Sequence, residues 1–135
     1  MKRVLLLLIS LAMVLAFAGC GDSPGKVSDV KVTLEPSSIY SEEDIQAAVT
    51  AAEEYFSENF NGCEMLEIAY PGDDLTLREQ EYREAEDVIV LISSFHVGRN
   101  GGDGSLNQND TYEDWLWILE KDKDGNWNHV DHGYG

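Results

Sequence analysis

The residues from Gly98 to Asp110 combine oxygen-bearing side chains with glycines, and this composition suits either a cation-binding loop or a simple turn. The oxygen donors there are Asn100, Asp103, Ser105, Asn107, Asn109 and Asp110. Calcium takes roughly six to eight oxygen ligands, but the run lacks the terminal glutamate of a calcium loop. No lysine follows its glycines as in a phosphate-binding loop. Because Gly, Asn and Asp also form tight turns, we predict a strand-to-strand connection without metal.

A second acidic run has the spacing of the twelve-residue calcium loop. Its members are Glu120, Asp122, Asp124, Gly125 and Asp131. That loop requires a helix on each side, whereas both flanks here alternate like strands. Its first residue is Glu where Asp is expected, and its last is Asp where Glu is expected. We therefore predict a hairpin turn at Asp124-Gly125.

The chain has three histidines, namely His96, His129 and His132. Residues three apart on a strand project to opposite faces, so we predict that His129 and His132 do not share a metal ion. We find no nucleophile elbow, no HExxH and no Ser/His/Asp set. We therefore assign no catalytic, metal-binding or cofactor-binding residue and expect no cofactor.

Three tryptophans in the last fifth of the chain are candidates for a ligand pocket or for the core. They are Trp115, Trp117 and Trp127. Aromatic side chains dominate burial in small domains, so we predict that these tryptophans belong to the core. Cys63 opens a strand-like segment, and we expect it to be buried and inert.

The N-terminus has the pattern of a secretory signal. Lys2 and Arg3 precede an apolar run from Val4 to Ala18, which is short of the roughly 20 residues that span a bilayer. Phe17-Ala18-Gly19-Cys20 resembles the bacterial lipobox. The resemblance implies cleavage after Gly19 and fatty acylation of Cys20, which would place the protein on the extracytoplasmic face of the cell membrane.

The charge balance excludes one class of partner. The chain has 9 Lys+Arg against 26 Asp+Glu, a net charge of −17. Removal of residues 1–19 takes away Lys2 and Arg3, which changes −17 to −19. No basic stripe is present for a phosphate backbone, so nucleic acid is excluded. A basic protein, a cation or a cationic small molecule is compatible with this charge, and so is a solvated coat that keeps the domain soluble.

The remaining pattern predicts an α+β domain. We expect residues 1–19 to form the signal peptide, residues 20–40 to form the lipidated Cys20 and a tether whose last part can lie against the domain, and residues 41–135 to form a single domain. Ser41 caps a long helix that ends at Asn61-Gly62. A short second helix follows Pro71-Gly72 and uses Leu75, Tyr82 and Ala85 as one face. About four strands form an antiparallel sheet, one of them before the second helix. The segment from Val88 is apolar on both faces, so we expect both faces of that strand to be covered.

A resemblance extends from about Tyr40 to Tyr134. The segments GGDGSLNQNDTYEDWLWIL and GNWNHVDHGY resemble an uncharacterised domain of short lipoproteins from Gram-positive bacteria. These domains are similar in layout to cystatin-like and nuclear-transport-factor-2-like folds, in which a long helix crosses a curved antiparallel sheet. The resemblance implies, as one alternative, a small isomerase or hydrolase with a pocket on the sheet. The predicted anchor and the lack of a catalytic constellation lead us to favour a non-catalytic binding or interaction module. A calcium-binding domain is a further alternative.

Overall fold

The computed structural model describes residues 24–99 and 104–134. Its elements are β1 (Lys31–Leu34), α2 (Glu42–Asn59), β2 (Cys63–Tyr70), α3 (Asp73–Arg83), β3 (Val88–Val97), β4 (Thr111–Lys121) and β5 (Trp127–Tyr134). The signal peptide, Cys20 and residues 100–103 lie outside the described part. Within it, no helix combines the length and apolar character needed to cross a bilayer.

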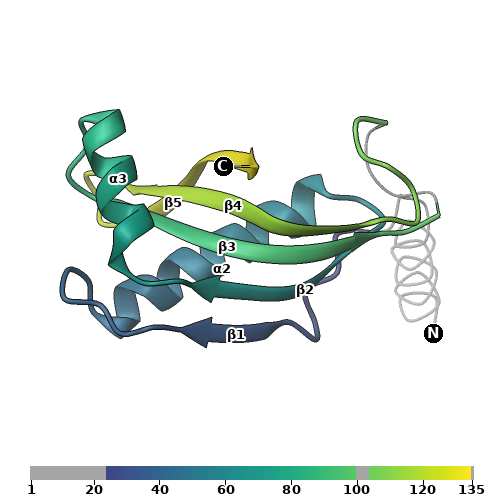
Figure 1. Ribbon diagram of the computed structural model, residues 1–135, viewed down its shortest axis with the longest axis horizontal. Coiled ribbons are helices and arrows are strands. Elements are labelled where there is room, and N and C mark those ends of the chain that lie inside the picture. The colour runs from purple at the N-terminus through teal and green to yellow at the C-terminus, as the bar shows by residue number, and fades with distance from the viewer. Residues whose placement is uncertain (1–23, 100–103, 135) are drawn as a thin grey trace, which may run out of the picture.

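Two helices pack on one mixed sheet with the strand order β1-β2-β3-β4-β5 (Figure 1). The strands from β2 to β5 are antiparallel neighbours, as expected. The predicted α+β class is confirmed, and the prediction of about four antiparallel strands is only roughly matched. A fifth strand, β1, pairs parallel to β2. The parallel direction follows from α2, which carries the chain back along the sheet between the two strands.

Residues 24–40, predicted to be a tether, are bonded to the domain along much of their length. The Gly25 amide donates to the carbonyl oxygen of Ser57 (3.0 Å), and the Lys26 amide donates to that of Cys63 (2.8 Å). A Cβ at position 25 would lie 2.2 Å from the carbonyl oxygen of Phe56, so the chain can approach α2 this closely only with glycine. The folded part of the chain therefore begins well before Ser41.

The long helix begins as predicted. The Asp44 amide donates to the Ser41 hydroxyl oxygen (3.1 Å), and that hydroxyl donates to the Asp44 carboxylate (3.2 Å). Three acidic residues in the first turn complement the positive end of the helix dipole. The buried stripe of the helix consists of Ile45, Ala48, Val49, Ala52 and Phe56.

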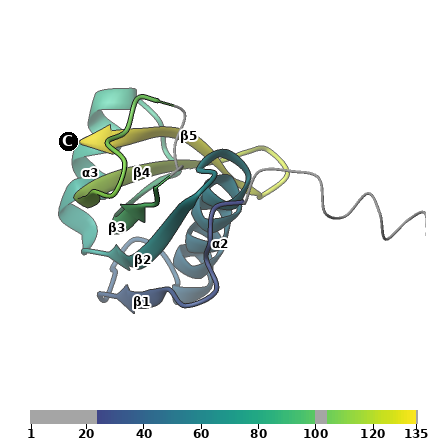
Figure 2. The ribbon, with the colours of Figure 1, turned by 90° about the vertical axis from the view of Figure 1, so that its right-hand side faces the viewer.

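The two helices cover opposite faces of the sheet, with α2 on one side and α3 on the other (Figure 2). Ile89 and Leu91 of β3 belong to the main core under α2. Val88 and Val90 alternate with them and form a second cluster with Ile118, against which Leu75 and Ala85 pack. The prediction that this strand is covered on both faces is confirmed. Tyr82, predicted to share the packed face of α3, is instead 81% exposed.

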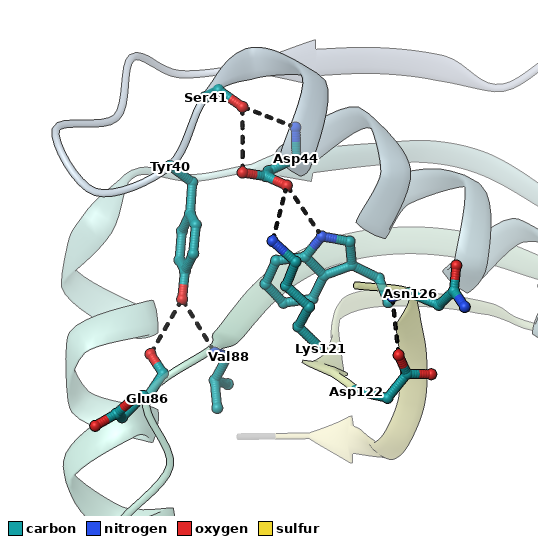
Figure 3. A network of polar contacts seen from close by, with 9 residues as sticks. Tyr40, Ser41, Asp44, Glu86, Val88, Lys121, Asp122 and Asn126 are labelled. Carbon is teal, nitrogen blue, oxygen red and sulfur yellow. Dashed lines mark hydrogen bonds and ion pairs between the residues drawn. The ribbon is translucent and has the colours of Figure 1, made fainter. Parts of the chain in front are cut away.

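A polar network connects the start of α2 to β3 and β4 (Figure 3). The Tyr40 hydroxyl accepts from the Val88 amide (3.1 Å) and lies 3.3 Å from the carbonyl oxygen of Glu86, to which it donates. The Asp44 carboxylate forms an ion pair with Lys121 (3.6 Å). These contacts join residues 40–44 to the beginning of β3 and the end of β4, and so fix the tilt of α2 across the sheet.

Candidate functional site

His129 and His132 lie side by side on β5, and their ring nitrogens Nε2 and Nδ1 are 2.8 Å apart. The prediction that they face opposite ways is wrong because β5 is bulged. Ile118 pairs with Asp131 while the next residue, Leu119, pairs with His129, so Val130 is left over. One extra residue shifts the alternation of side chains by one position. The bulge thereby brings both imidazoles to the face that α2 covers.

Aromatic rings from two elements enclose the histidine pair. Tyr55 of α2 stacks on His129, with ring centroids 3.6 Å apart and planes inclined by 14°. Trp115 of β4 stacks on His132 at 5.7 Å. Phe60, just after α2, approaches His132 edge-on at 5.4 Å. The imidazoles are thus half-buried among aromatic rings.

A pocket of about 220 Å³ opens beside His132, between the last turns of α2, the two C-terminal strands and the loop before β4. Its lining residues are Tyr55, Asn59, Phe60, Ser105, Leu106, Trp115 and His132. Ligand sites typically combine apolar and aromatic walls with a few convergent polar groups. This lining has that composition, and it contains neither lysine nor arginine.

Two side chains of the pocket, Asn59 and His132, present hydrogen-bond acceptors. The Asn59 side-chain nitrogen donates to the carbonyl oxygen of Tyr55 (3.0 Å), which leaves the amide oxygen Oδ1 for a ligand. The backbone carbonyl of His129 acts on its own imidazole, which favours a proton on Nδ1, the nitrogen turned away from His132. In that tautomer a neutral His129 accepts at Nε2 from Nδ1–H of His132, and His132 keeps a lone pair on Nε2.

Trp115 contributes ring carbon atoms to the pocket. Its indole Nε1 is buried and has no hydrogen-bond partner among residues 24–99 and 104–134. Because this nitrogen has almost no exposed surface, a ligand in the pocket meets the carbon atoms of the indole. Trp115 therefore supplies no hydrogen-bond donor to a ligand in the pocket.

Burial lowers the pKa of both imidazoles below the ordinary value of 6.5. For His129, the neighbouring His132 lowers the pKa further, whereas Asp131 raises it. Asp131 also raises the pKa of His132, against the larger effect of burial. Both rings are therefore mostly neutral at pH 7.

We expect the free energy of unfolding to decrease as the pH falls from 7.5 to 5.5. The unfolded chain binds a proton on each imidazole near pH 6.5, while the folded chain resists protonation until a lower pH. Between those two pKa values the unfolded state holds more protons, so stability rises with pH in that window and falls on acidification. Urea denaturation at four pH values measures the slope.

Variants of the three histidines serve as controls for the pH dependence of the free energy of unfolding. Replacing both His129 and His132 with Gln is expected to flatten the curve between pH 5.5 and 7.5. His96→Gln is expected to leave it unchanged, because His96 contacts Thr111 (2.9 Å) at the other end of β4. A wild-type curve that is already flat in this window would contradict the assignment.

The calcium-like run forms the predicted hairpin turn. One oxygen of the Asp122 carboxylate accepts from the amides of Asp124 (2.9 Å) and Asn126 (3.0 Å). The other accepts from the Asn128 side chain (2.8 Å). These bonds hold the pKa of Asp122 below its ordinary value, the amide bond from Asn126 most of all. Both oxygens of this carboxylate therefore accept hydrogen bonds within the turn.

The glycine-rich segment connects β3 to β4, as predicted, and part of it also lines the pocket. Asn100 and Asp103 lie outside the described residues. Of the rest, Ser105 and its neighbour Leu106 line the pocket, and the Asp110 carboxylate accepts from the Thr111 amide (2.9 Å). In the described ranges, no three His, Cys, Asp or Glu side chains are grouped to hold a metal ion.

The tryptophans are buried, as predicted: Trp117 is fully enclosed, and Trp115 and Trp127 are nearly so. Trp115 serves both interpretations, because it packs in the core and also lines the pocket. Cys63 is buried as well. Sequence reasoning missed Tyr55, Asn59 and Phe60, which looked like the end of a packed helix. Only the bulge, which has no local sequence signal, brings the histidines beneath them.

A wider groove lies beside β1 and the start of α2, with a volume of about 670 Å³. Its lining is mostly aliphatic and acidic, with Val32, Leu34, Glu35 and Glu42 among its residues. Among the described residues that line it, none is aromatic. The pocket beside His132 is therefore the better candidate site.

Comparison with known proteins gives no relative. No family model, no curated protein sequence and no solved structure matches this chain.

Proposed function

We propose that this chain is a lipid-anchored domain on the outer face of a cell membrane that binds a small molecule without transforming it. The observation that carries the binding role is the pocket beside His132, where three aromatic residues and two acceptors converge. Lipidation is supported by the short apolar run and by Ala18-Gly19-Cys20 at its end. The layout, a long helix across a sheet with a pocket at one end, supports placing it with the cystatin-like and nuclear-transport-factor-2-like folds.

The binding role is tested with a chemically broad panel of small molecules, calcium included. We expect at least one organic compound to raise the melting temperature of the wild-type chain, because a ligand that binds only the folded state stabilises it by mass action. Tyr55→Leu should abolish that shift, since Tyr55 lines the pocket. Tyr82→Leu should preserve it, since Tyr82 stands exposed on α3. Shifts that survive Tyr55→Leu would place binding elsewhere and defeat the proposal.

One observation favours a second function, that of a small isomerase- or hydrolase-like enzyme. A histidine whose partner ring fixes its tautomer has a lone pair suited to proton abstraction, and His132 is held in this way by His129. Turnover of a panel compound that disappears in His132→Gln would establish the enzyme. Binding without turnover would leave the non-catalytic role in place.

A further inference from the structure

The walls, acceptors and charge of the pocket beside His132 are matched by one chemical class of ligand. The rings of Tyr55, Phe60 and Trp115 form much of its lining. Aromatic faces attract cations, more strongly when the cation is shielded from water. Among the described residues that line the pocket, no basic side chain opposes a positive ligand.

The hydrogen-bond acceptors of the pocket also favour a cationic ligand. Asn59 commits its side-chain nitrogen to the Tyr55 carbonyl oxygen and keeps its amide oxygen available. The hydrogen bond from His132 Nδ1 to His129 leaves Nε2 of His132 with a lone pair. An ammonium group has only donors, so it satisfies both acceptors, whereas a carboxylate satisfies neither.

Charge around the pocket completes the match. Tyr55 also borders a shallow groove on its other side, where Glu54 and Glu58 lie. The whole chain is strongly acidic, with a net charge of −17. A field of this sign concentrates cations near the surface and repels anions.

We propose that the pocket beside His132 binds the ammonium group of a small organic cation, held by the rings of Tyr55, Phe60 and Trp115 and by the acceptor atoms of Asn59 and His132. This inference rests on the proposed binding function and names the ligand class for the same site. Because a protonated His132 would repel the ligand and lose its lone pair, affinity falls on acidification.

The surroundings of His132 determine how it titrates. On β5 it faces His129, and Asp131 acts on it through space. From α2 it meets Tyr55, and from β4 the indoles of Trp115 and Trp117. The carboxylate of Asp131 is paired with Arg83 at 3.1 Å, so its charge is partly compensated.

The test compares three probes of one size and three charges: butylammonium, 1-butanol and butyrate. Affinities for the mature chain in neutral detergent are measured from the indole N–H signals in NMR spectra, with empty micelles as the blank. At pH 7.5 we expect butylammonium to bind about tenfold more tightly than 1-butanol, as the upper range of a cation–π contact allows, and butyrate to bind most weakly. Equal or tighter binding of 1-butanol or butyrate would overturn the ligand class.

Acidification supplies a second, independent arm. Lowering the pH from 7.5 to 5.0 should weaken butylammonium binding several-fold in the wild type and in His96→Gln. In His132→Gln that pH effect should vanish. A pH effect that persists there would refute the role of His132. If His132→Gln does not fold, Tyr55→Leu serves instead, and the preference for butylammonium over 1-butanol should shrink toward one.

The outcomes separate this inference from the proposed function. Binding of 1-butanol or butyrate that depends on Tyr55 would keep the binding module and remove the cation. A complete failure of the broad panel, together with silence of all three probes, would remove both. Tetramethylammonium, which has no N–H donor, apportions the preference between the rings and the acceptors: binding equal to that of butylammonium would overturn the part assigned to Asn59 and His132.

Discussion

Replacing Trp117 with alanine is expected to move the denaturation midpoint of the domain far below that of the wild type. Trp117 is fully buried, and its indole packs against Phe60 at 5.3 Å and Phe56 at 6.2 Å. Truncation of a buried tryptophan costs about 3–5 kcal/mol. Domains of this size have total stabilities of roughly 5–15 kcal/mol, so this one change removes a large share.

A hydrogen bond adds to the cost. Trp117 Nε1 donates to the Ser93 hydroxyl oxygen at 2.7 Å, and that hydroxyl donates to the carbonyl oxygen of Trp115 at 3.3 Å. Loss of the indole leaves a buried acceptor with one partner fewer. Trp117→Phe retains a ring but not the N–H, so its loss of stability should lie between those of Trp117→Ala and the wild type.

Denaturant titration followed by circular dichroism measures these differences. Tyr82→Ala is the matched control, because Tyr82 is 81% exposed and surface substitutions usually change stability by only about 0.5 kcal/mol or less. A midpoint for Trp117→Ala equal to that of Tyr82→Ala would show that the core is not organised around this indole.

The second large effect concerns attachment to the membrane. Cys20→Ala is expected to abolish incorporation of a tagged fatty acid and to release the chain from the membrane fraction. Each buried methylene contributes about 0.8 kcal/mol, so stable anchoring needs more than one acyl chain. With no acyl chain, none of this free energy remains.

Cys63→Ala is the control for that experiment. Cys63 is 2% exposed, so it offers no surface for acylation and its replacement should leave labelling intact. Metabolic labelling followed by membrane fractionation reads out both variants. Equal labelling of Cys20→Ala and the wild type would end the anchor hypothesis, and so would a wild-type chain that is found entirely in the medium.

Many parts of the fold depend on local sequence patterns, and these parts could be predicted from the sequence. The Ser41 cap and the apolar stripe of α2 are periodic signals within one element. The double-sided burial of β3 follows from its continuous run of apolar residues. The turn at Asp122 depends on side chains that bond to amides a few residues away.

The missed features depend on contacts between distant segments. Strand β1 has only four residues, most of them exposed, and becomes a strand because β2 offers an edge to pair with. The bulge at Val130 is defined by the register against β4, so no property of β5 alone reveals it. The pocket could not be predicted for the same reason, since its lining comes from α2, a loop and two strands.

If Cys20 is lipidated, the close contact of Gly25 with α2 limits how far the domain stands from this anchor. Gly25 is bonded to Ser57, only five residues after Cys20. A fully extended chain spans at most roughly 3.6 Å per residue, so the connection reaches about 18 Å. With acyl chains on Cys20, the last turns of α2 would lie within about that distance of the lipid headgroups. The pocket shares those turns, so it would sample molecules diffusing along the bilayer surface before those in the open medium.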